Sequence, residues 1–319
     1  DINRIPLDDT KTFELYAQAK TIAVFQVESS GMRDALSQLK PTCIEDIIAL
    51  VALYRPGPME NIPKFCLVKN GEQERETIHP LIDEILNETQ GIIVYQEQVM
   101  EIARRMGGYS LGGADLLRRA MGKKIKEAMD AEKPKFLAGS IKNNVNKKTA
   151  VKVWDLLEKF ANYGFNKSHA AAYAVLSYQT AWLKANHPIE FMAAVMNCDI
   201  HLTEKLNVYK QEIENLGLKL KAPCINTSKA YFSVVDGKIF YALGALKNIG
   251  VGAVEHIVNI RTAKGPFLNI FDFAQRLDLR KFGKRPLEML IRSGAFDCLN
   301  KNRKFLFMSI EKLISFSSA

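Results

Sequence analysis

Apolar side chains recur every three or four residues through most of this chain, a spacing that gathers them on one side of an α-helix. Ser30, Ser110 and Ser168 stand where an N-cap hydroxyl would satisfy free backbone N–H groups. Glycine and proline at 107–108 and 55–58 interrupt the spacing, because neither residue continues a helix well. The spacing predicts helices over residues 10–19, 30–39, 44–53, 96–106, 111–121, 147–161, 168–186 and 188–197.

Short runs typical of β-strands occur only late, at 218–220, 231–235 and 239–243, with the turn signal Asp236-Gly237 between the last two. The sequence therefore predicts a mainly α fold in which a multi-helix domain, residues 1–222, precedes a small β hairpin and a helical tail. We place this second part at residues 223–300. Residues 301–319 are expected to form a C-terminal helical segment or linker.

Composition narrows the class of protein without identifying it. The 319 residues are 47% hydrophobic and 25% charged, which suits a globular chain, and no apolar run reaches the length of about 18 residues that a membrane span needs. The chain begins at Asp1 with neither methionine nor a signal-peptide pattern, so we expect it to be a piece of a longer protein. Five scattered cysteines without a CxxC pair indicate free thiols in a reducing cytoplasm rather than disulfides or zinc.

The net charge of +9 is unevenly distributed. Acidic residues outnumber basic ones in residues 1–100, and the reverse holds in residues 101–319. A basic majority suits a surface that faces a polyanion, although solvated helix faces explain the same charge. Motifs have to decide between the two interpretations.

The first motif is a polar turn at residues 163–169 that leads into an apolar helix. It offers an amide, an ammonium, a hydroxyl and an imidazole, from Asn166 to His169, beside the free N–H groups of a helix N-terminus. This combination is suited to binding phosphate. The alternative is that residues 170–176 are simply core and that His169 and Tyr173 form a packed aromatic pair rather than a platform for a base.

The second motif is a glycine-flanked basic helix at residues 112–124. Arg119 and Lys123 share one face, and Asp115, four residues before Arg119, is placed to hold its guanidinium while leaving part of the planar fork for phosphate oxygens. The alternative is an exposed amphipathic helix with an ordinary ion pair.

The third motif, residues 246–257, alternates apolar residues with Gly250 and Gly252 in the manner of a helix-hairpin-helix. Glycines there let backbone amides approach a phosphodiester closely, so that duplex DNA is held without reading its sequence. Arg261, Lys264 and the basic run at 280–285 support this interpretation, and a simple αα-hairpin is the alternative.

With these motifs in order, the chain resembles the fingers region of the alpha subunit of bacterial DNA polymerase III, a C-family replicative polymerase. The resemblance covers essentially the whole chain and both basic motifs. It also includes the segments Ile5-Pro6-Leu7-Asp8-Asp9, Val24-Phe25-Gln26-Val27-Glu28-Ser29, Ala49-Leu50-Val51-Ala52-Leu53-Tyr54-Arg55-Pro56-Gly57-Pro58, Ile93-Val94-Tyr95-Gln96-Glu97-Gln98-Val99-Met100 and Ser293-Gly294-Ala295-Phe296-Asp297.

The resemblance implies a fingers domain, residues 1–222, that closes over the template and incoming deoxynucleoside triphosphate. A tandem helix-hairpin-helix module in residues 223–300 would then hold the duplex. The nucleotide-facing residues implied are Arg55, Gln96, Gln98, Arg118, Arg119, Lys123, Lys124, Asn166, Lys167, Ser168, His169 and Tyr173. The implied DNA-facing residues are Lys247, Ile249, Gly250, Val251, Gly252, Arg261, Arg280 and Lys281.

The resemblance also implies parts that lie elsewhere in such an enzyme. Polymerisation in this family uses two Mg²⁺ ions held by carboxylates of a palm domain that precedes the region seen here. Asp8-Asp9 and Glu45-Asp46 are interpreted as helix-start residues, so we expect this chain to hold no metal and no catalytic residue and to bind without synthesising. The partners implied are primer-template DNA, deoxynucleoside triphosphate and, through regions mostly outside this chain, the proofreading exonuclease, sliding clamp and clamp loader.

Two other classes of protein stay open at this point. A non-enzymatic helix-hairpin-helix DNA-binding or repair adaptor would keep its duplex affinity when Arg119 and Lys167 become alanine. A helical scaffold would show no salt-dependent association with DNA, whereas phosphate contacts make affinity fall steeply as salt rises.

Overall fold

The computed structural model describes residues 1–122, 126–160 and 164–317. The chain divides into two compact units, Asp1–Asn186 and His187–Ala319, which are considered separately. Helices dominate the described part of both units, so the mainly α prediction is confirmed. None of the helices in these ranges is both long enough and apolar enough to cross a membrane.

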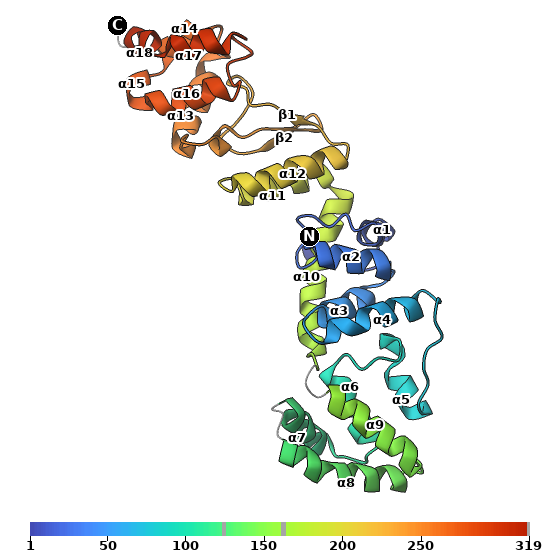
Figure 1. Cartoon of the computed structure of the whole chain (residues 1–319). Helices are drawn as coiled ribbons and strands as arrows, with labels where there is room; N and C mark the ends of the chain where they lie inside the picture. Colours follow the sequence, from blue (N-terminus) through green and yellow to red (C-terminus); the bar gives the residue numbers. More distant parts are fainter. Residues whose placement is uncertain (123–125, 161–163, 318–319) are drawn as a thin grey trace. The chain divides into compact units, whose positions relative to one another are not determined.

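The first unit contains ten described α-helices and three short 3₁₀ helices. Figure 1 labels the α-helices. The α-helices are α1 (Thr10–Ala17), α2 (Ser30–Leu39), α3 (Ile44–Leu53), α4 (Ile62–Lys69), α5 (Pro80–Ile85), α6 (Gln96–Arg105), α7 (Leu111–Gly122), α8 (Lys126–Lys142), α9 (Lys147–Phe160) and α10 (Lys167–Asn186). The 3₁₀ helices are η1 (Ile2–Arg4), η2 (Pro58–Asn61) and η3 (Asn87–Thr89).

One core of this unit forms where α10 packs against α1 and α3, far from it in sequence. Tyr178 of α10 lies 5.5 Å from Phe13 between ring centroids, and the hydroxyls of Tyr16 and Ser177 are 2.9 Å apart in the interior. A second core joins α5 to α9 and contains Phe136 and Trp154. The start of α6 and the start of α10 lie next to each other, and Tyr95 and Phe165 form an isolated parallel bridge there.

The second unit combines helices with a three-stranded sheet. Its elements are α11 (Pro188–Cys198), α12 (Thr203–Asn215), β1 (Leu220–Lys221), β2 (Ser233–Val235), β3 (Lys238–Phe240), η4 (Leu243–Ala245), α13 (Val251–Lys264), α14 (Ile270–Arg276), α15 (Leu279–Phe282), α16 (Lys284–Arg292), α17 (Arg303–Met308) and α18 (Ile310–Phe316).

The sheet has the order β1-β3-β2. Strands β2 and β3 are antiparallel, with Val234 opposite Ile239, and both turn residues between them have positive φ, as the Asp236-Gly237 signal predicts. The sequence did not predict that β1 would pair in parallel with β3, which adds a third strand to the hairpin.

Two predicted boundaries differ from the observed division. The units separate at Asn186, well before 222/223, because α11 packs on β2 and β3 and the Asn197 amide exchanges two hydrogen bonds with the Phe232 backbone. At the other end, Leu306 and Leu313 are buried in the same core as α14 and α16. Residues 301–317 contain α17 and α18 and pack into the second unit, so of the two expectations the helical segment is confirmed and the linker is not.

Candidate functional site

The predicted phosphate-binding turn is attached to the start of α6. The backbone N–H of Gln96 donates to the Phe165 carbonyl at 2.9 Å, and the backbone N–H of Phe165 donates to the Val94 carbonyl at 3.3 Å. The Gln96 side chain adds a third link, because its Nε2 donates to the Gly164 carbonyl at 3.0 Å. These bonds fix residues 164–169, here called the 164–169 turn, against one end of α6.

Arg118 of α7 reaches the same place. Its Nη1 donates to Gln96 Oε1 at 3.0 Å, while its Nε and Nη2 both donate to Asp115 Oδ1, at 3.0 and 2.7 Å. The guanidinium is therefore oriented by two acceptors, and 29% of the side chain stays exposed. Through Gln96 the structure brings the two basic motifs together, although they are almost 50 residues apart in sequence.

Arg119 is held as the sequence predicts. Its Nε lies 2.9 Å from Asp115 Oδ2, and 63% of its side chain is exposed. The hydrogen bond from Arg118, with the charges of both arginines, keeps the pKa of Asp115 below its usual value. One carboxylate thus orients two cations, and the Nη groups of Arg119 have no acceptor among the described residues. Lys123 and Lys124 lie outside the described residues.

The N-terminus of α10 is already capped from within the protein, which the sequence did not predict. Asn166 Oδ1, rather than Ser168, accepts from the His169 N–H at 2.8 Å. Glu97 Oε2 accepts from the Lys167 N–H at 3.0 Å, and Glu97 Oε1 accepts from Asn166 Nδ2 at 2.8 Å. A carboxylate therefore occupies part of the helix end where we expected phosphate.

Lys167 and Ser168 have different surroundings. The Lys167 ammonium lies 2.6 Å from Glu88 Oε2 and 5.4 Å from the centre of the Tyr95 ring, so it is ion-paired in this structure. Ser168 is exposed. Glu88 and Glu97 are the partners that sequence reasoning missed, because an acidic residue distant in sequence gives no signal that it will cap a helix.

An aromatic row runs from Phe165, just before α10, along the first turns of that helix, and its central member His169 is exposed. Phe165, His169 and Tyr173 follow at four-residue intervals, with ring centroids 5.5 and 4.6 Å apart, and Phe25 lies 5.6 Å beyond Tyr173. At the opposite end of the row, Arg55 stacks on Phe165, with its guanidinium carbon 4.6 Å from the ring centre. Burial lowers the pKa of Arg55 from its usual value. The row presents flat surfaces of the kind on which nucleobases stack.

Gln98 does not belong to this exposed surface. Only 4% of it is accessible, and its Oε1 accepts from the N–H groups of Val94 and Tyr95 at 2.8 and 3.0 Å. Its Nε2 donates to the Thr89 hydroxyl at 2.8 Å. We therefore reassign Gln98 from a predicted nucleotide contact to a residue that positions the segment before α6.

In the second unit, residues 246–250 of the predicted hairpin line a hollow of about 410 Å³. Lys247 and Gly250 line it together with His201 and Thr203, which sequence reasoning missed. Gly250 caps α13 with an ordinary φ of −76°, and a Cβ added to Gly250 or Gly252 would meet nothing within 4 Å. The fold itself thus places no steric demand for glycine at these positions, which leaves close approach by a ligand as a physical reason for them.

Three of the predicted DNA contacts have structural roles instead. Ile249 is 6% exposed and packs in the core, with partly buried Val251 against it. Arg261 points inward, where its Nη1 donates to the carbonyls of Ile225 and Ser228 at 2.6 and 3.0 Å, and burial lowers its pKa from the usual value. Arg280 and Lys281 are exposed on α15, and the Lys281 ammonium lies 3.4 Å from Asp278.

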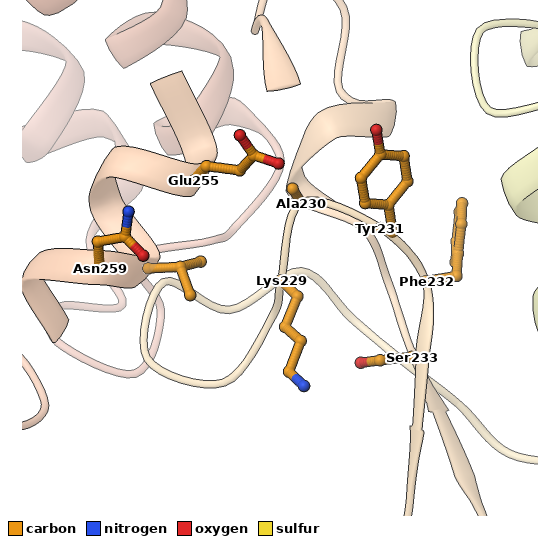
Figure 2. A pocket seen from close by; sticks show the side chains of 8 residues that line it. Lys229, Ala230, Tyr231, Phe232, Ser233, Glu255 and Asn259 are labelled. Carbon is orange, nitrogen blue, oxygen red and sulfur yellow. The ribbon is translucent and has the colours of Figure 1, made fainter. Parts of the chain in front are cut away.

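A smaller hollow of about 260 Å³ lies on another side of α13 (Figure 2). Glu255 and Asn259 come from this helix, and Lys229 and Tyr231 come from the segment that leads into β2. Its lining shares no residue with the hairpin hollow. We assign it no role.

Comparison with known proteins finds matches in both halves of the chain. Residues 1–144 match the family model of the bacterial DNA polymerase III alpha subunit finger domain, and residues 217–306 match that of the helix-hairpin-helix motif. The chain is therefore similar to the bacterial DNA polymerase III alpha family.

Relatives in this family match nearly the whole chain. DNA polymerase III subunit alpha of Caulobacter vibrioides is 51% identical over 315 residues, which are 99% of this chain and 28% of that protein. The subunit of Escherichia coli strain K12 is 49% identical over 97% of this chain and 27% of its own length. The Chlamydia pneumoniae subunit is 48% identical over 97% of the chain and 25% of its own length. The chain thus spans only about a quarter of the length of these polymerase III alpha relatives.

Replacing Gly250 with valine should separate binding from folding. Because Gly250 has an ordinary φ and open space around its Cα, the melting temperature should stay within about 2 °C of the parent. Duplex DNA affinity, measured by fluorescence anisotropy, should fall about tenfold as the side chain keeps phosphate away from the backbone amides. Unchanged affinity would mean that the hairpin only packs.

Proposed function

We propose that this chain forms the fingers and duplex-holding part of a replicative DNA-directed DNA polymerase, which extends a primer 5′ to 3′ on a template. The observation that carries the proposal is the Arg118 network. Arg118 is gripped by Asp115 and Gln96, and Gln96 in turn holds the 164–169 turn. Together with Arg119 these residues make up what we call the α7–α10 surface.

The α7–α10 surface is suited to a triphosphate. Two guanidinium groups oriented by one carboxylate can meet phosphate oxygens without reorganising, and the aromatic row from Phe165 to Tyr173 offers faces for a base. During attack by the primer hydroxyl, charge moves toward the leaving pyrophosphate. Cations that are already held in place stabilise this negative charge on the pyrophosphate. Such positioned electrostatic stabilisation is the main contribution of a protein to phosphoryl transfer.

The 164–169 turn would enter this binding by exchanging partners. Lys167 is paired with Glu88, and the Lys167 N–H with Glu97, so a triphosphate has to compete with two carboxylates. A substrate that carries several negative charges can displace a single carboxylate from an exposed ammonium. We infer that Lys167 exchanges Glu88 for a phosphate when nucleotide binds.

Metal-binding carboxylates have to come from another part of such an enzyme. The carboxylates that begin α1 and α3 do not fit the role, because Asp9 Oδ2 accepts from Thr12 and Asn186, and Asp46 Oδ2 lies 3.3 Å from the Lys69 ammonium. The described residues hold no cluster of three His, Cys, Asp or Glu side chains. We propose that Mg²⁺ is bound outside this chain. We also propose that the complete enzyme is cytoplasmic and associates with a proofreading exonuclease, a sliding clamp and a clamp loader.

Alanine at Arg119 or Lys167 in the complete polymerase subunit tests this function. Each substitution should lower kcat/KM for deoxynucleoside triphosphate about tenfold while primer-template affinity stays within about twofold, because each removes one phosphate contact. Steady-state incorporation and fluorescence anisotropy measure the two quantities.

Arg104→Ala is the matched control. It breaks an exposed ion pair with Glu101 of comparable length, 2.9 Å, on α6 but outside the α7–α10 surface. Wild-type incorporation by both test variants, with duplex binding retained, would favour the alternative of a helix-hairpin-helix DNA-binding adaptor.

A further inference from the structure

A cavity of about 270 Å³ lies in the first unit, and no residue of the Arg118 network lines it. Its walls come from η2, α4, α5, the segments before α5 and α6, α6 itself and α9. Neither Arg118 and Arg119 nor any residue of the 164–169 turn lines it. The size is close to that of small-molecule sites, which begin at about 300 Å³.

The interior of the cavity is apolar. Ile82, Leu86, Ile102 and Val153 form its buried part, and the partly exposed side chains of Ile78, Ile93, Leu156 and Phe160 complete it. Such a lining gains free energy when an apolar body displaces water from it.

The rim of the cavity carries charged side chains, and those without an ion-pair partner are mostly basic. Lys64 is 3.0 Å from Glu76, and that ion pair spans α4 and the segment before α5. Lys152 and Lys159 lie seven residues apart on α9, which places them on the same face. Both are exposed, and neither has an ion-pair partner among the described residues. Two unpaired ammonium groups therefore outnumber the one unpaired carboxylate at the rim, Glu60.

We propose that this cavity binds an amphipathic organic anion, a molecule with an aromatic or aliphatic body and one carboxylate or sulfonate group. The apolar lining takes the body, and Lys152 with Lys159 takes the anionic group in charge-assisted hydrogen bonds. A nucleotide is a poor match, because its sugar and base carry many polar groups and the interior offers few partners. The site is independent of the proposed polymerase function, so either can fail without the other.

The probe for the test is 8-anilinonaphthalene-1-sulfonate, whose fluorescence rises in apolar surroundings and whose structure is of the proposed class. Titrated into the folded 319-residue chain, it should show a saturable site with one molecule per chain. Leu156→Trp fills the cavity and should weaken this binding at least tenfold. The double variant Lys152→Glu with Lys159→Glu should weaken it about tenfold, because two attractive charges become repulsive.

The matched control reverses the same number of charges on the same helix. Lys147 and Lys148 are exposed on α9 but do not line the cavity, so Lys147→Glu with Lys148→Glu should change binding by less than about twofold. Circular dichroism melting establishes that each variant is folded. If Leu156→Trp does not fold, the two charge variants still decide the question. Equal loss in both charge variants, or none in either, would overturn the site.

Displacement tests the chemistry of the head group. Octanoate should displace the bound probe, whereas octylamine, with the same chain and the opposite charge, should require at least tenfold higher concentration. Equal displacement by the two would show that the cavity selects only the apolar body and would overturn the anionic assignment.

Discussion

Alanine at Arg118, introduced into the complete polymerase subunit, is expected to reduce kcat/KM for nucleotide incorporation about 10²-fold, equivalent to about 2.7 kcal/mol. The effect should exceed that of Arg119→Ala, because Arg118 both offers a cation and connects α7 to the 164–169 turn through Gln96. Its removal leaves Gln96 Oε1 without this donor and leaves Asp115 Oδ1 without both of its hydrogen bonds from Arg118, so that only Arg119 offsets the charge of this carboxylate near phosphate. Single-turnover incorporation at varied nucleotide concentration measures the loss.

Arg118→Lys separates charge from geometry. Lysine keeps the positive charge but cannot donate to Asp115 and Gln96 through a planar fork, so its kcat/KM should fall between those of wild type and Arg118→Ala. Primer-template affinity should remain within about twofold for both variants. Wild-type kinetics for Arg118→Ala would remove this residue from nucleotide binding.

Gln98→Ala should be the most damaging of these changes to folding, at about 3 kcal/mol of unfolding free energy. The side chain is buried and satisfies two backbone N–H groups, those of Val94 and Tyr95, which alanine would leave without an acceptor. The Thr89 hydroxyl would also lose its donor. Urea unfolding of the 319-residue chain, followed by circular dichroism, measures the change.

Gln38→Ala provides the comparison for Gln98→Ala. Gln38 is exposed on α2 in the same unit, so its truncation should change the unfolding free energy by less than about 0.5 kcal/mol. A similar small effect at both positions would show that the buried amide network contributes little to stability.

The spacing of apolar residues predicted a helix well where these residues lie on one face that is buried in a core. The ranges 30–39 and 44–53 are those of α2 and α3, since each helix buries one consistent face. Helix α8 escaped prediction because its apolar residues follow no stripe and Pro134 lies within it. The predicted domain end at residue 222 differs from the end of the first compact unit at Asn186, because nothing in residues 187–222 reveals that α11 packs on a sheet formed later in the chain.

The candidate site shows the same division between local and long-range information. The Asp115–Arg119 pair was predictable, because residues four apart share a helix face. The Gln96–Arg118 contact, the Glu97 cap and the inward turn of Arg261 were not, because each depends on segments that only the fold brings together. A basic residue in a motif shows that a positive charge is present, but the direction in which its side chain points depends on the acceptors that the fold brings near it.

Photocrosslinking tests the location of the nucleotide most directly. A deoxynucleoside triphosphate with an aryl azide on its γ-phosphate would be bound to the complete subunit with primer-template, irradiated, and its labelled peptides identified by mass spectrometry. If the triphosphate meets the α7–α10 surface, the label should fall within residues 111–119 or 164–173. Label confined to other segments, with nucleotide binding intact, would contradict the assignment.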